Sequence, residues 1–134
     1  MPLWNRLYNT IWLALFSCVM VPRWMGTSWG VAVHALLGLG LAALTVANAR
    51  TLKALPVPPR LQRISKVTAG IALAQAVLGM ALGAVNHLAP GVPVVGTVIL
   101  CAHVVFALAI LSQSSSVATG YDMWEEKEFS PKPT

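Results

Sequence analysis

Residues 67–121 read VTAGIALAQAVLGMALGAVNHLAPGVPVVGTVILCAHVVFALAILSQSSSVATGY, and no Lys, Arg, Asp or Glu occurs among them. A bilayer core about 30 Å thick needs about 20 apolar helical residues to cross it. The 55 residues from 67 to 121 therefore suffice for two crossings. Residues 86–93, NHLAPGVP, combine Asn, Gly and two prolines near the middle, and the missing proline N–H groups would break one continuous helix. We predict a helical hairpin that turns here.

Two further uncharged segments precede this one, from residue 7 to 22 and from 24 to 49. The first is short, so a tilt of the helix or local bilayer thinning must accommodate it. We predict an all-α integral membrane protein, an antiparallel four-helix transmembrane bundle followed by a C-terminal tail. The expected spans are about 7–22, 28–49, 66–87 and 94–114, and the expected tail is 115–134.

The composition agrees with a membrane protein and excludes other classes. Of 134 residues, 57% are hydrophobic and 10% charged, against about 25% charged in an ordinary soluble domain. The net charge of +5 comes from bases that form no dense patch with interleaved aromatics, so we expect no nucleic-acid partner. A cleaved signal peptide is not expected either, because residues 21–30, VPRWMGTSWG, offer no small-x-small cleavage site.

Basic residues indicate the orientation, because cytoplasmic loops of membrane proteins are rich in Lys and Arg. The connection between the second and third spans should be cytoplasmic, and with four spans both termini are cytoplasmic too. All four acidic residues lie in the tail, which resembles a solvated or partner-docked segment. The bases of the connection are Arg50, Lys53, Arg60, Arg63 and Lys66.

No expected span contains an acidic residue, and this excludes several functions. A carboxylate proton relay, a carboxylate-bridged di-metal bundle and a charge-coupled transporter all need such groups. A Ser–His–Asp triad would lack its third member. Histidine and cysteine are the ionisable side chains that remain at membrane depth.

Two histidines should lie at one level of the bilayer. His34 is about 9 Å and His103 about 14 Å from the outer ends of their spans, whereas His87 falls near the headgroups. A polar side chain in hydrocarbon usually has a partner, and two imidazoles on different helices could clamp one haem iron. The alternative is that each ring only donates a hydrogen bond to a neighbouring carbonyl.

Small residues share the helical faces of these histidines. Gly30 and Gly38 lie one turn on either side of His34 and would leave room for a flat macrocycle. The alternative is that such residues let transmembrane helices approach closely, which is also the simplest explanation of Gly79 and Gly83.

Three segments together resemble one four-helix half of the haem A synthase family: VHALLGLGLAAL from residue 33, GIALAQAVLGMALG from residue 70 and ILCAHVVFALAIL from residue 99. Halves of that family carry a histidine early in the second and fourth helices and a Gln followed four residues later by Gly in the third. His34, His103, Gln75 and Gly79 match these positions. The resemblance covers about residues 28–114 and implies a haem site near the extracytoplasmic side.

The chain departs from that family in two places. The catalytic half carries a glutamate three residues before the second-helix histidine, and Val31 stands there in this chain. The family's extracytoplasmic cysteine pair is also missing, since Cys18 and Cys101 fall inside the first and fourth expected spans. The resemblance therefore supports the scaffold and the haem site more than the enzymatic activity.

Two more residues are candidates for contact with a haem. Arg23 is the one base expected on the outer side, where it could pair with a propionate, although it could equally reach the headgroups. Gln75 could donate to the haem edge or to a histidine, although a hydrogen bond between helices is the commoner arrangement.

We expect a haem-b-binding membrane protein of the bis-histidine cytochrome b type, with His34 and His103 as iron ligands. It would be an electron-transfer or accessory subunit beside other membrane subunits of a respiratory complex, in a prokaryotic plasma membrane. Three alternatives stay open. They are a haem A synthase-like oxidoreductase converting haem O to haem A, a cofactor-free structural or assembly subunit, and a copper protein that uses sulfur ligands with His103.

Overall fold

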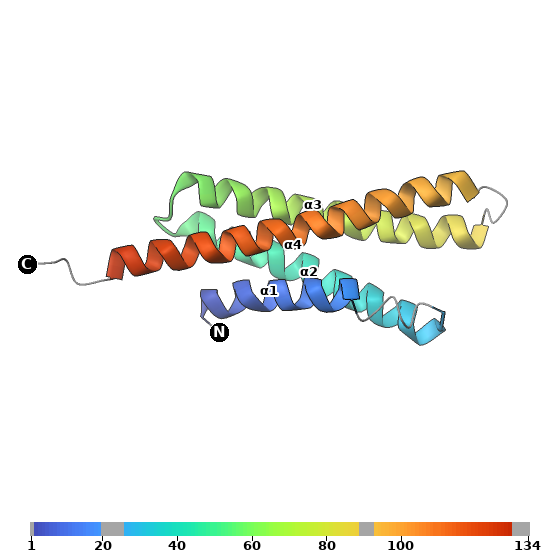
Figure 1. Ribbon diagram of the computed structural model, residues 1–134, viewed down its shortest axis with the longest axis horizontal. Helices are drawn as coiled ribbons and strands as arrows, with labels where there is room; N and C mark the ends of the chain where they lie inside the picture. Colours follow the sequence, from blue (N-terminus) through green and yellow to red (C-terminus); the bar gives the residue numbers. More distant parts are fainter. Residues whose placement is uncertain (1, 20–25, 89–92, 130–134) are drawn as a thin grey trace, which may run out of the picture.

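The computed structural model describes residues 2–19, 26–88 and 93–129, and nearly all of them are helical. The four helices are α1 (Leu3–Val19), α2 (Ser28–Ala54), α3 (Pro59–Leu88) and α4 (Pro93–Phe129). They run alternately up and down as one elongated bundle (Figure 1). The predicted all-α four-helix membrane bundle is confirmed.

Local sequence explains where the helices begin and end. The Thr27 side chain caps α2 by accepting a hydrogen bond from the Gly30 N–H at 3.1 Å. α2 stops before Leu55, which is extended because a proline follows it. α3 and α4 each start with a proline, the residue best suited to a first helical position because it has no N–H to leave unpaired.

The helices pack as a ring in which neighbours touch and diagonal pairs do not. α1 packs against α2 and α4, and α3 packs against the same two helices on the other side. In the described parts of the chain no Cα atom of α2 lies within 8 Å of one in α4, and the same holds for α1 and α3. A side chain of α2 can therefore meet one of α4 only across the bundle axis.

Three helices, α2, α3 and α4, are long and apolar enough to cross a membrane. α1 has 17 residues, and the end predicted for its span at residue 22 lies outside the described residues. That α1 also crosses stays a prediction. The helices extend beyond the predicted spans, and the expected tail is a continuation of α4 as far as Phe129.

The bundle interior consists of layers, and the first is apolar. It lies at the end where α2 leads into α3, and it joins all four helices and the connection. The C-terminal part of α4 packs into this layer and is therefore part of the bundle core. Its buried members are Leu7, Leu52, Val57, Leu61, Val117, Ala118 and Tyr121.

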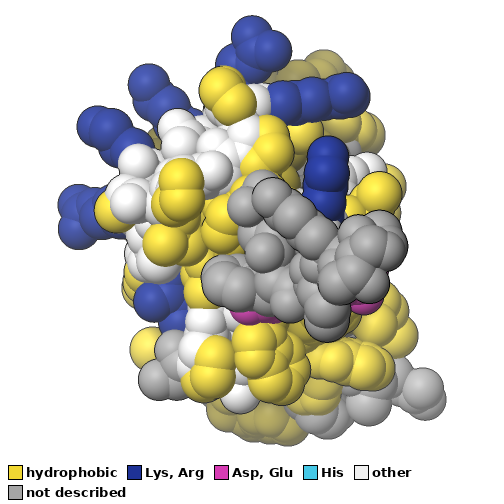
Figure 2. Space-filling model, turned by 90° about the vertical axis from the view of Figure 1, so that its left-hand side faces the viewer, with side chains coloured by type: hydrophobic (Ala, Val, Ile, Leu, Met, Phe, Trp, Pro, Cys, Tyr) yellow, Lys and Arg dark blue, Asp and Glu magenta, His cyan; other side chains and the backbone are white. Residues whose placement is uncertain are grey.

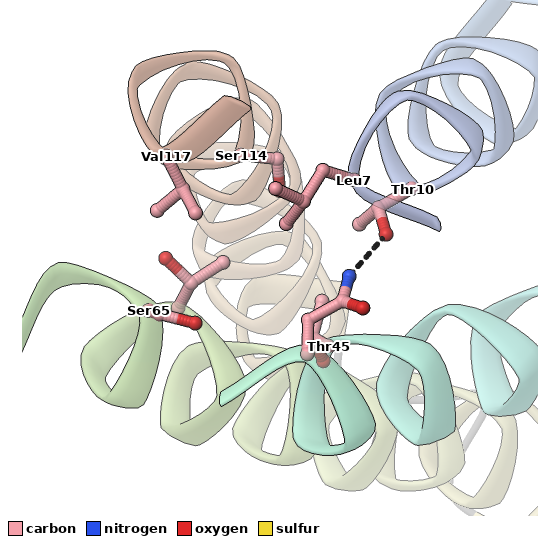
Figure 3. Close-up of a pocket in the computed structure, with 8 residues that line it drawn as sticks. Leu7, Thr10, Thr45, Ser65, Ser114 and Val117 are labelled. Carbon is pink, nitrogen blue, oxygen red and sulfur yellow. Dashed lines mark hydrogen bonds between the residues drawn. The ribbon is translucent and has the colours of Figure 1, made fainter. Parts of the chain in front are cut away.

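The second layer is polar and surrounds a small cavity (Figure 3). The Asn48 amide donates to the Thr10 hydroxyl at 2.9 Å, and Arg6 Nε donates to Asn48 Oδ1 at 3.0 Å. Thr68 pairs with Gln113 at 2.9 Å on the opposite side. Each of the four helices contributes to the layer. Its buried polar residues are Thr10, Thr45, Asn48, Ser65, Thr68 and Ser114.

The third layer is apolar again, and it follows the polar layer along every helix. Its largest buried members are Leu41 of α2 and Ile110 of α4, and Ile110 is 1% exposed. Small alanines fill the remaining space, as close-packed interiors require. The buried residues of this layer are Ala14, Leu41, Ala42, Ala72 and Ile110.

Candidate functional site

Beyond the third layer, the rings of His34 and His103 lie side by side. Their centroids are 5.9 Å apart and their planes are inclined by 57°. His34 comes from α2 and His103 from α4, the diagonal helices whose backbones do not touch. The two imidazoles thus meet across the bundle axis, at one level, as the sequence predicted for their depth.

The spacing of the two rings suits a single metal ion between them. An imidazole nitrogen lies about 2 Å from a transition metal that it binds, so two imidazoles on opposite sides of one ion have ring centres roughly 6 Å apart. The observed 5.9 Å is close to this value. Two axial histidines are the donor set of a b-type haem, and the residues present therefore fit that group.

Unpartnered polar atoms surround the same point. Nδ1 of His34, Nδ1 of His103 and Oε1 of Gln75 are buried, and none has a hydrogen-bond partner among the described residues. A buried polar atom without a partner is costly, and such atoms often mark a ligand site. Gln75 belongs to α3 and lies one turn before Gly79, whose Cβ position adjoins the His103 ring.

Gly79 belongs to the site for a steric reason. A Cβ atom at this position would come within 3.2 Å of His103 Cε1, a distance that real Cβ atoms seldom show. Close packing of helices is the simplest explanation of Gly79 from the sequence, and the structure shows that Gly79 also makes room for a histidine ring. Residues 79 and 103 are each 12 residues from residue 91, which predicts a similar depth on the two helices but not that they touch.

The protein's own side chains do not close the core around the histidine pair. Among the described side chains, no hydrophobic residue is fully buried on α2 before Leu41, on α3 after Ala72 or on α4 before Ile110. Protein interiors are normally close-packed. A Cβ at Gly38, one turn from His34, would meet no atom within 4 Å. No neighbouring atom therefore occupies the Cβ position of residue 38, one turn from His34.

The other predicted site residues have different positions. Gly30 is buried, and its N–H is engaged by the Thr27 cap, so it closes the start of α2 one turn before His34. Arg23 lies outside the described residues, and its pairing with a propionate stays a prediction. His87 is in the last turn of α3. The structure brings His34, His103 and Gln75 together.

The cysteines do not join this site. Cys18 is half-buried on α1, Cys101 is exposed on α4, and both are free thiols. Within residues 2–19, 26–88 and 93–129, no group of three or more His, Cys, Asp or Glu side chains is close enough to hold a metal ion. A copper site that combines Cys18, Cys101 and His103 is therefore not assembled.

Fold and site together define a class, an α-helical membrane bundle with a histidine pair on its axis. Comparison of the chain with protein-family models, with curated proteins and with solved structures finds no match.

Proposed function

We propose that this protein is a membrane cytochrome of the b type, in which His34 and His103 are the axial ligands of one haem b. The observation that carries the proposal is the pair of imidazoles 5.9 Å apart on diagonal helices. The resemblance to half of a haem A synthase points to the same two histidines. When bound, the haem supplies one-electron redox chemistry, and the chain's own residues set its position and environment.

The histidines act here as neutral ligands. A neutral imidazole has one nitrogen with a free lone pair and one N–H, so each ring can bind iron through the first and be held through the second. Oε1 of Gln75 is another buried polar atom without a partner among the described residues, and it can accept a hydrogen bond from a ring N–H. We assign Gln75 the role of orienting one of the two rings.

In this proposal the macrocycle occupies the space beside the small residues around the histidines, within the apolar part of the bundle. Gly38 and Gly79 have no side chains, so α2 and α3 project little beside the histidines. Exposed apolar side chains such as Leu36 and Val105 form the outer surface of the bundle. The third core layer separates the pair from the polar layer. We therefore propose that the haem lies near the extracytoplasmic side and exchanges electrons there with other subunits of a respiratory complex in a prokaryotic plasma membrane.

A haem A synthase-like oxidoreductase is the second candidate, favoured by the match of His34, Gln75, Gly79 and His103 to that family's positions. Val31 replaces the family's glutamate, and it is 48% exposed. Conversion of haem O to haem A would thus have to proceed without a carboxylate at this position. A cofactor-free structural subunit would instead use the histidines as hydrogen-bonding groups only.

A reduced-minus-oxidised absorption spectrum of the purified full-length protein tests the proposal. We expect the sharp α-band of a low-spin haem b. His34→Ala and His103→Ala should each abolish the band or greatly weaken it, and His87→Ala should leave it intact. A wild-type protein expressed with ample haem that shows no band, or a band unaffected by both histidine variants, would refute bis-histidine ligation.

A second assay separates the two haem-dependent candidates. Membranes that contain haem O are incubated with the protein, and the extracted haems are separated by chromatography. Unchanged haem O together with a stable α-band supports the cytochrome, whereas conversion to haem A supports the oxidoreductase. A protein that lacks the band and is folded by circular dichroism would support the structural subunit.

A further inference from the structure

The end of the bundle opposite the histidine pair carries a cluster of bare positive charges. Five bases occur within residues 50–66, on the last turns of α2 and the first turns of α3, and this segment contains no acid. All five side chains are exposed, and none has an ion pair or side-chain hydrogen bond among the described residues. We call these five side chains the basic hairpin. They are Arg50, Lys53, Arg60, Arg63 and Lys66.

Two of the acidic residues at this end accept hydrogen bonds from tyrosines. Asp122 accepts a hydrogen bond from Tyr8 of α1, and Glu125 accepts one from Tyr121 of its own helix at 3.5 Å. In Figure 2 most Lys and Arg side chains gather along the upper and left rim of this end, apart from the visible Asp and Glu side chains. No ion pair among the described residues offsets the charge of the basic hairpin, and bases three residues apart on a helix repel one another.

The depth of these bases identifies their counter-ion. Arg50 and Lys66 are the first charges beyond the uncharged parts of α2 and α3, so they mark the edge of the hydrocarbon. At 1.5 Å per residue, Lys53 and Arg63 lie about 5 Å further out and Arg60 about 9 Å. The headgroup region on each side of a bilayer is roughly 5–8 Å thick. Four of the bases thus occupy the depth of the lipid headgroups, and Arg60 lies at its outer edge.

We propose that the basic hairpin binds the headgroups of anionic phospholipids in the leaflet at this end of the bundle. Lys and Arg donate charge-assisted hydrogen bonds to phosphate oxygens, and each base near an anionic surface strengthens binding by about fivefold. The bound lipids neutralise the repulsion within the hairpin and so hold the α2–α3 connection against the membrane surface. This surface is independent of the haem site.

Native mass spectrometry of the full-length protein in mild detergent tests this proposal. Phosphatidylglycerol and phosphatidylcholine with identical acyl chains are added at equal concentrations. We expect several-fold more phosphatidylglycerol adducts on the wild type. The preference should disappear in the variant that combines Arg50→Gln, Lys53→Gln, Arg63→Gln and Lys66→Gln. A wild type without preference, or a variant that keeps it, would overturn the proposal.

Two controls exclude trivial explanations. Glu125→Gln with Glu126→Gln raises the net charge by two without touching the hairpin, and the preference should stay at the wild-type level. The proposal would fail if this acid-to-amide variant raised the preference for phosphatidylglycerol by as much as the hairpin variant lowers it. Net charge alone would then explain the binding. The milder pair Lys53→Gln with Arg60→Gln should give an intermediate preference at an unchanged melting temperature, which separates lipid binding from folding.

Discussion

Gly79 of α3 lies directly against the ring of His103 of α4, because a Cβ at position 79 would approach His103 Cε1 to 3.2 Å. This contact determines which edge of the His103 ring faces α3. It also makes position 79 sensitive to a single methyl group, since His103 has to move if that group is added. Four residues later, Gly83 has no atom within 4 Å of its Cβ position, so α3 offers a matched pair of glycines.

Gly79→Ala should therefore displace His103 and weaken haem binding, whereas Gly83→Ala should not. Both variants gain about 1 kcal/mol of intrinsic helix propensity, so a difference between them reports the contact with the ring. We expect a smaller or shifted α-band for Gly79→Ala in the reduced-minus-oxidised spectrum. Equal spectra for the two variants would show that the ring does not need the space at position 79.

Replacing one axial histidine with methionine should raise the reduction potential of the haem. Methionine paired with histidine stabilises ferrous haem more than two histidines do. We expect a more positive midpoint for His34→Met and for His103→Met in a redox titration, with haem retained. A midpoint identical to that of the wild type would mean that the substituted histidine is not a ligand.

Asn48→Ala should destabilise the bundle. The Asn48 amide donates to Thr10 of α1 and accepts from Arg6 Nε, so its removal breaks both of these hydrogen bonds between α1 and α2 at a cost of about 1–3 kcal/mol. The loss would appear as a lower midpoint in thermal unfolding in detergent. Thr97→Ala is the control, because Thr97 is exposed and bonds only within its own helix. A stability loss no larger than that of the control would contradict a structural role for the polar layer.

Ile110→Ala and Leu108→Ala should differ strongly in stability, although both shorten an aliphatic side chain of α4. Ile110 is 1% exposed and Leu108 is 57% exposed. A buried Ile→Ala change costs about 2–5 kcal/mol through lost contacts and the cavity that it leaves, whereas the Leu108 side chain faces lipid. The same unfolding measurement checks this. Similar losses for the two variants would mean that Ile110 is not in the core.

Much of the fold follows from where the charges are. The uncharged segment 67–121 and the prolines inside it predict the α3–α4 hairpin, and both helices are found. The ends of the helices were less predictable, because charge marks the edge of the membrane and not the end of a helix. α2 continues past Arg50 to Ala54, and α4 continues into the expected tail as far as Phe129, with Tyr121 buried against other helices.

Of the candidate site, the common depth of the two histidines could be predicted from the sequence. Depth along a helix can be counted from the sequence, and so the meeting of His34 and His103 could be predicted. Contact across a helix pair depends on rotation and tilt, which residue types do not specify. Hence the close approach of Gly79 to His103 and the layer of hydroxyls around Asn48 emerged only from the structure.

The third core layer, with Leu41 and Ile110 among its buried residues, is also a barrier to the movement of protons along the bundle. Its buried residues carry only aliphatic side chains, so they offer no relay by which a proton could travel from the polar layer to the histidine pair. If the proposed haem is bound at the pair, any proton that accompanies its reduction would have to come from the water phase nearer the histidines, because the third layer offers no path from the other side.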